Sequence, residues 1–422
     1  KRFMGVEADI EAVAPMHVIG ALSLNTKNIK LQLRNECRQW KVQYSDKVHH
    51  QAKEQMLALQ EYIRKTTNSL ARDVVDLESL RFVMNVLKEV RERESSIELE
   101  IGPILDMYAL LEMYLPGGNW PTYYKKAKGS YVWDLENNKY LDIGLMGVGT
   151  NILGYSNKQI DRAVSRAIFN GNMSSLNCIE EVELSKKLLS INPWAGMVKF
   201  ARTGGEANAM AIRIARAAAK NKNIAVCGYH GWHDWYLSAN LSSKKKLNEH
   251  LLPGLEPLGV PKGLKGSVIP FKFNNWEDLD NVVRKKAKSC AAIILEPCRE
   301  SYADKKFIIE LRKIANKNNC VLIFDEITSG WRINTGGAHQ KLGVNPDIVV
   351  YGKTIANGIP MGAIIGKKKI IESSLNTFIS SAFWTERLGP ACALEFIKIY
   401  SKDKINKKLI YIGKKIKKIW IN

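Results

Sequence analysis

The sequence predicts an α/β fold with a mostly parallel sheet and helices on both faces. Short apolar runs rich in β-branched residues lie at 291–295, 321–324 and 347–351, and polar or charged residues follow each of them. Runs of this length without polar alternation are typical of strands buried on both faces. Charged side chains at their ends are expected at the carboxyl edge of the sheet, where ligand sites of α/β proteins form.

An all-α segment is predicted ahead of the sheet. The stretches 28–65 and 77–93 have few helix breakers, and the second has heptad-like apolar spacing. The composition changes near Gly118, after which glycine turns separate strand and helix patterns. The predicted units are a helical segment at 1–118, a large domain at 119–400 and a helix of a further domain at 401–422.

A strand-to-helix turn is predicted around Gly204 and Gly205. Residues 197–202 resemble a strand, and a helix is expected to begin near Glu206. Glycines at such a turn let backbone amides approach a phosphate, whose charge the helix dipole favours. The alternative interpretation is a plain tight turn.

Two charged residues follow neighbouring apolar runs. Asp325 ends the run 321–324, and Lys353 comes just after the run 347–351 and Gly352. A lysine amine at a sheet edge can form a Schiff base, and an aspartate can keep a pyridinium nitrogen protonated. Chemistry that depends on pyridoxal 5'-phosphate (PLP) needs both groups.

The composition is that of an ordinary globular protein, with 45% hydrophobic residues. The seven cysteines are scattered without a CxxC pair, which predicts reduced thiols and a cytoplasmic location. No apolar run reaches the length of a membrane span, and the amino terminus lacks a signal-peptide core. Neither a membrane nor a disulfide framework is therefore expected.

The formal net charge of +21 raises the possibility of nucleic-acid binding. The lysines are dispersed, however, and no compact patch alternates them with aromatic residues. The densest run, 402–418, has apolar residues at helical spacing. It predicts a helix with one buried face and one solvated lysine face, which we favour over a basic nucleic-acid surface.

Several separated motifs occur along the second part of the chain. They are YVWDLENNKYLDIG from Tyr131, RTGGEANAMAIRIARA from Arg202, GYHGWHDW from Gly228, LEP from Leu295, FDEITSGWR from Phe324, YGKTIANGIPMGA from Tyr351 and WTERLGPACALEFI from Trp384. With them, the chain from about Trp120 to Asn422 resembles the class III aminotransferases, in particular the glutamate-1-semialdehyde aminomutase-like branch. The resemblance implies the large domain of fold type I PLP-dependent transferases, and amino-group transfer through a lysine Schiff base between small-molecule donors and acceptors such as amino acids or amino sugars.

The resemblance also implies contacts with the cofactor. Gly204 and Gly205 match the residues that bind the phosphate. Tyr229 matches the aromatic residue that stacks on the ring, and the adjacent His230 is taken as a further cofactor contact. Glu296 lies at the sheet edge beside the cofactor, where a structural hydrogen-bonding role and a catalytic role are both open.

Asp325 matches the partner of the pyridine nitrogen, and Lys353 matches the Schiff-base lysine and general base. Thr385 matches the threonine that reaches the phosphate in the neighbouring subunit, so the resemblance implies a homodimer. His230 and His233 have a spacing that could suggest a metal pair. Without a third ligand in the sequence, we predict no metal site.

The first part of the chain resembles a different protein class. Residues 77–118, and the stretch from Leu22, are similar to the tail and linker region of an axonemal dynein heavy chain. This resemblance implies a fusion at Gly118–Asn119, contacts with other dynein tail elements and, as the alternative function, a structural or motor-associated role without enzymatic activity. At the other end, residues 409–422 resemble the first helix of the family's small carboxyl-terminal domain, which we expect to be truncated.

Overall fold

The computed structural model describes residues 124–421 except 136, 144–145, 244–245, 249, 251–254 and 299–300. The predicted helical segment at 1–118, its boundary with the large domain and its dynein-like resemblance lie outside the described residues.

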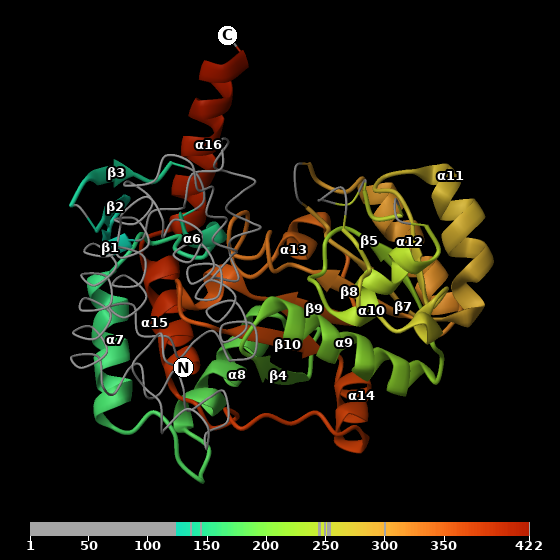
Figure 1. Ribbon diagram of the computed structural model, residues 1–422, viewed down its shortest axis with the longest axis horizontal. Coiled ribbons are helices and arrows are strands. Elements are labelled where there is room, and N and C mark those ends of the chain that lie inside the picture. Colours follow the sequence, from blue (N-terminus) through green and yellow to red (C-terminus); the bar gives the residue numbers. More distant parts are fainter. Residues whose placement is uncertain are drawn as a thin grey trace, which may run out of the picture. The chain divides into compact units, whose positions relative to one another are not determined.

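A seven-stranded sheet forms the centre of the described part, with the strand order β4-β10-β9-β8-β7-β5-β6 (Figure 1). The strands are β4 (Met197–Ala201), β5 (Asn223–Cys227), β6 (Val268–Pro270), β7 (Cys290–Leu295), β8 (Val321–Asp325), β9 (Ile348–Tyr351) and β10 (Gly362–Gly366). Pairs from β6 through β9 are parallel, whereas β10 is antiparallel to both β9 and β4. The prediction of a mostly parallel sheet is confirmed.

Helices cover both faces of this sheet. The two apolar layers draw on alternate residues of the same strand: Ile293 packs with one layer and Ile294 with the other. The first layer includes residues of α8 (Ile179–Ile191), α12 (Lys305–Lys317) and α15 (Leu388–Lys402). The second is built on α9 (Gly204–Ala219), α10 (Asp234–Leu237) and α14 (Lys368–Ile371). The predicted α/β architecture is therefore confirmed.

The other elements are shorter or lie outside the sheet. An antiparallel meander is formed by β1 (Tyr124–Lys128), β2 (Tyr131–Asp134) and β3 (Lys139–Leu141). The remaining helices are α6 (Met146–Gly149), α7 (Lys158–Phe169), α11 (Trp276–Asp278), α13 (Ala338–Leu342) and α16 (Ile405–Ile421). Tighter or wider turns are η3 (Ser238–Leu241), η4 (Lys262–Leu264), η5 (Leu279–Arg284), η6 (Ala287–Ser289), η7 (Lys353–Ala356) and η8 (Glu372–Asn376).

The start of α9 differs from the sequence prediction. The helix begins at Gly204 and not near Glu206, because Thr203 caps it. The Thr203 hydroxyl accepts from the Glu206 amide, and the Glu206 side chain accepts from the Thr203 amide. Such a reciprocal pair satisfies donors that are otherwise unpaired in the first turn. Gly204 and Gly205 therefore lie inside the helix and present first-turn amides.

The prediction of a buried face on the lysine-rich helix is wrong. In α16, Ile405 and Leu409 are half-buried, but Ile412, Ile416 and Ile419 are exposed. Helical spacing of apolar residues indicates a face, but it does not supply the neighbour that would cover it. Within the described ranges, no helix combines the length and the apolar character needed to cross a membrane.

The cysteines in the described part are buried free thiols. They are Cys178, Cys227, Cys290, Cys298, Cys320 and Cys392. Burial raises the pKa of Cys290 and of Cys298 to about 11, so both thiols stay protonated near neutral pH. They behave as small apolar side chains of the core.

Helix α12 offers a matched test of the apolar layer. Leu311 is fully buried, whereas Ile309 on the same helix is 36% exposed. Leu311→Ala should lower the free energy of unfolding by about 2–5 kcal/mol because it leaves a cavity. Ile309→Ala should cost only about 1 kcal/mol or less because its site is open to water. Urea denaturation measures both, and equal losses would contradict this assignment of the buried face.

Candidate active site

The strand ends bring the predicted site residues to one edge of the sheet. Since β4, β5, β7, β8 and β9 all run in the same direction, the residues that follow them lie at a common edge. This edge receives Gly204 after β4, Tyr229 after β5, Glu296 after β7, Asp325 at the end of β8 and Lys353 after β9. It is the position at which ligands bind in open α/β sheets.

Asp325 is a buried acid at this edge, with only 2% of its surface exposed. Its Oδ2 atom accepts from Asn208 Nδ2 at 2.7 Å and lies 2.8 Å from His230 Nδ1. Its Oδ1 atom accepts from the Ile327 amide at 3.0 Å. A buried carboxylate needs such donors, because desolvation without them is costly.

His230 lies between β5 and α10 and is buried. The residue is 1% exposed and its Nδ1 atom faces Asp325. The structure therefore places His230 against the carboxylate. Asn208, one turn into α9, also donates weakly to the His230 carbonyl at 3.3 Å. The three side chains form one buried polar cluster.

Tyr229 is held by the end of β7. Its amide donates to Glu296 Oε2 at 2.9 Å, and its ring packs edge-on against Tyr236 with centroids 6.0 Å apart. Burial, helped by the negative charges of Glu296 and Asp325, raises the pKa of the Tyr229 phenol. Glu296 thus makes the structural hydrogen bond that was one of its two predicted roles.

Lys353 opens η7 in an unusual backbone conformation. Its φ is +45°, a left-handed value that costs energy for any residue other than glycine. Its Nζ atom donates to Thr328 Oγ1 at 3.1 Å, and Thr328 belongs to the turn that follows Asp325. Strain of this kind persists only where the surroundings hold the residue in place, and it clusters at functional sites.

The first turn of α9 begins with Gly204 and Gly205, which have no side chains, and we call this pair the glycine cradle. A Cβ atom at Gly205 would lie 2.7 Å from the His233 ring, and one at Gly204 would lie 2.9 Å from Ile327. Both approaches are closer than real Cβ contacts allow, so only glycine fits without a shift. The first-turn amides of Gly204 and Gly205 and the helix dipole make this end of α9 suited to an anion.

Thr385 stands apart from this group. Its hydroxyl donates to the Ser174 carbonyl at 2.6 Å. The segment that contains Thr385 reaches the α9 turn through Arg202, which pairs with Glu386 at 3.4 Å and donates to the Phe383 carbonyl. The structure therefore does not bring Thr385 into the cluster around Lys353 within this chain.

These residues fit the cofactor that the resemblance implies. PLP needs an acid for its ring nitrogen, an amine for its aldehyde and an anion site for its phosphate. Asp325, Lys353 and the Gly204–Gly205 cradle offer these three groups at one sheet edge. Burial lowers the pKa of His233, whose ring lies against Gly205, so His233 is neutral near pH 7.

Sequence reasoning missed Asn208 and Thr328. Asn208 is a polar residue on the buried face of an amphipathic helix, which is a signal for a buried hydrogen bond. Thr328 lies three residues after Asp325, but only the folded chain places it at Lys353. The spacing in the sequence carries no sign of that contact.

The family of class III aminotransferases matches residues 115–419. The chain belongs to this family. The match begins close to the predicted boundary at 118/119, which stays a prediction. The matched residues include the whole seven-stranded sheet, its strand ends and the glycine cradle.

Several known proteins are similar to the chain. It is 33% identical over 296 residues to a 3-aminobutyryl-CoA aminotransferase of Cloacimonas acidaminovorans, covering 68% of this chain and 67% of that protein. It is 34% identical over 282 residues to a glutamate-1-semialdehyde 2,1-aminomutase of Methanobrevibacter smithii, covering 63% and 65%. The chain thus spans about two thirds of the length of these relatives. An omega-transaminase from Sphaerobacter thermophilus has a similar structure, with a TM-score of 0.60, 26% identity and 74% of each chain covered.

The left-handed backbone at Lys353 leads to a stability prediction for this aminotransferase. Lys353→Gly should be more stable than Lys353→Ala by about 1 kcal/mol, because only glycine adopts a φ of +45° without strain. Both variants lose the amine, so the comparison isolates the backbone. The matched control is Ala356→Gly in the same turn, which should destabilise by about 0.5–1 kcal/mol. Urea denaturation of the apo-proteins measures all three, and a less stable Lys353→Gly would refute the strain.

Proposed function

We propose that the chain is a PLP-dependent enzyme that transfers amino groups through Lys353. The observation that carries this proposal is the meeting of Asp325 and Lys353 at the ends of the adjacent strands β8 and β9. Membership of the class III aminotransferases supports it. So does the similarity to a structure described as a transaminase with PLP bound, at 26% identity and a TM-score of 0.60.

Each residue has a task that its surroundings suit. When bound, PLP draws electrons from the substrate carbon that carries the amino group, provided that its ring nitrogen is protonated. Asp325 is placed to keep that proton, since Asn208 and His230 hold its carboxylate. The amides of Gly204 and Gly205 bind the phosphate.

Tyr229 covers the ring, and Glu296 supports Tyr229 through its backbone amide. Lys353 holds the cofactor and then moves the proton at the substrate carbon. Thr328 orients the Lys353 amine before it reacts.

The substrates are small amino donors and acceptors. The relatives include an aminotransferase and an aminomutase, so transfer between two molecules and transfer within one molecule are both open. The free buried thiols accord with the cytoplasmic location that forms part of this proposal. A structural role as a dynein fragment would depend on residues 1–118.

The attachment of the cofactor tests this proposal directly. PLP incubation, borohydride reduction and peptide mapping should place the label on Lys353, and Lys353→Ala should remove it. Lys199 is the matched control, because burial lowers the pKa of this half-buried amine and makes it a competing nucleophile. Lys199→Ala should therefore keep the label on Lys353. Labelling of Lys199 instead, or absence of any label, would contradict the assignment.

We also propose that the aminotransferase part forms a homodimer through the face beside Thr385. Large apolar side chains are exposed around Ser174, the partner of Thr385: Phe169 is 90% exposed, Leu176 79% and Phe383 57%. Exposed apolar side chains gathered on one face are typical of interaction sites, and two-fold pairing would bury the same patch on both chains. Such pairing would bring Thr385 to the partner's phosphate site.

Sedimentation velocity of the PLP-treated protein tests the dimer. Leu176→Asp should shift the protein towards monomer, because a charge in the centre of an apolar interface is costly to bury. Leu258→Asp is the control, since Leu258 is 93% exposed in the segment between β5 and β6. A wild-type monomer that binds PLP stoichiometrically would rule out a shared site.

A further inference from the structure

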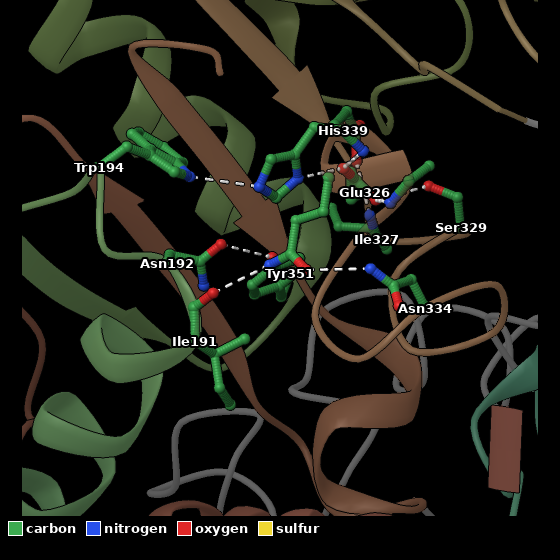
Figure 2. Close-up of polar contacts among 12 residues, drawn as sticks. Ile191, Asn192, Trp194, Glu326, Ile327, Ser329, Asn334, His339 and Tyr351 are labelled. Atoms are coloured by element: carbon green, nitrogen blue, oxygen red, sulfur yellow. Dashed lines mark hydrogen bonds and ion pairs between the residues drawn. The ribbon is translucent and has the colours of Figure 1, made fainter. Parts of the chain in front are cut away.

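A second buried acid lies directly behind Asp325. Glu326 is fully buried, and adjacent residues at a strand end point to opposite sides of the sheet. Its carboxylate accepts from the amides of Ala338 and His339, from His339 Nδ1 at 2.7 Å and from Ser329 Oγ at 3.2 Å. Figure 2 shows these contacts converging on Glu326 from the turn after β8 and from α13.

Hydrogen bonds to both ring nitrogens fix the orientation of His339. Trp194 Nε1 can only donate, and it reaches His339 Nε2 at 3.3 Å (Figure 2). His339 Nε2 is therefore the acceptor, and the ring proton lies on Nδ1, which donates to Glu326. The Trp194 ring also packs edge-on against the imidazole, with centroids 5.7 Å apart. His339 is fully buried, so it has one orientation and one donor role.

The backbone of Glu326 connects this pair to the reactive lysine. The Glu326 amide donates to the Val350 carbonyl at 2.9 Å, which joins β8 to β9, and the Glu326 carbonyl accepts from the Gly330 amide at 2.7 Å. That closes the turn that presents Thr328 to Lys353 Nζ. The Gly330 carbonyl then accepts from the Thr354 hydroxyl at 3.1 Å, next to Lys353.

The stability that such a pair contributes does not explain its presence. A buried carboxylate loses its hydration even where it accepts hydrogen bonds, and an apolar pair of the same size is often as stable. A fully hydrogen-bonded buried network does impose one arrangement on the elements that it joins. Here those elements are the turn after β8 and α13, and the turn carries the hydroxyl that touches Lys353.

We propose that Glu326 and His339 are positioning residues of the cofactor site. Their hydrogen bond holds the turn after β8, so that Asp325 faces Asn208 and His230 while Thr328 meets Lys353 Nζ. The inference rests on the proposed PLP function and adds that the site is preorganised from the opposite face of the sheet. Neither residue touches the cofactor.

Two substitutions of His339 separate geometry from simple folding. His339→Leu removes the donor to Glu326 and should weaken PLP binding roughly 10-fold, since small displacements of reacting groups have large effects. It should also move the visible absorbance of the bound cofactor and its pH midpoint. His339→Asn keeps an amide donor near the position of Nδ1. It should restore PLP affinity to within about 3-fold of wild type, together with the wild-type absorbance and pH midpoint.

The control is Asp347→Asn at the other end of β9. Asp347 is also buried, and it pairs with Arg312 at 2.8 Å and Lys367 at 2.7 Å. Its loss should lower the melting temperature, as the loss of the His339 bond does, but should leave PLP affinity and absorbance unchanged. Fluorescence titration of the full-length apo-protein measures affinity without any assay of turnover.

The outcomes are distinct. If wild type binds PLP and His339→Leu binds it with equal affinity and the same absorbance, the pair is only structural and the inference is wrong. If wild type fails to bind PLP, the proposed function falls and the inference falls with it. If His339→Leu does not fold, Ser329→Ala removes one hydrogen bond to Glu326 without burying an unpaired charge. Ser329→Ala should weaken PLP affinity by about 3-fold and shift the absorbance in the same direction as His339→Leu does. No shift in either quantity would overturn the inference.

Discussion

The architecture of the site depends on keeping the Asp325 carboxylate buried at the end of an apolar strand. A buried carboxylate must receive hydrogen bonds, and the donors come from α9, from the segment after β5 and from its own turn. This requirement explains why distant segments meet here. Asn208 lies one turn beyond the glycine cradle and His230 directly follows Tyr229, so satisfying Asp325 also aligns the anion site and the aromatic ring.

The same strand ends are fixed from both sides. Asp325 faces the reactive side, while Glu326 enters the network of His339 and Trp194 on the other. On the neighbouring strand, Tyr351 donates its hydroxyl to Asn192 at 3.2 Å, two residues before Lys353 (Figure 2). Buried polar contacts specify orientation better than apolar ones, because they are satisfied in few arrangements. The strained backbone of Lys353 is tolerated within this frame.

The strands and their functional ends could be predicted from the sequence, because uninterrupted apolar runs that end in Asp325 or precede Lys353 fit few structures other than buried parallel strands. The sequence predicts Gly204 and Gly205 in the turn before the helix, whereas the structure has them in the first turn of α9. The reason is that Thr203 caps the helix, which therefore begins at Gly204. The apolar face of α16 was misjudged, because periodicity does not say what lies opposite a helix. The contacts of Asn208, Thr328 and His339 depend on tertiary structure that no local pattern encodes.

The order of strands has a consequence for how the site is made during synthesis. The edge strand β4, with the cradle after it, pairs with β10, which is the last strand of the sheet along the chain. Asp325 meets Asn208 across 117 residues and His230 across 95. By contrast, β8, β9 and β10 are neighbours both in sequence and in the sheet, so the lysine turn is a local unit that can close quickly. During synthesis the cradle leaves the ribosome well before β10, the strand that pairs with β4. Until β10 is made, the apolar faces of the earlier helices stay uncovered. The cofactor can therefore bind only late in folding, after the sheet is complete.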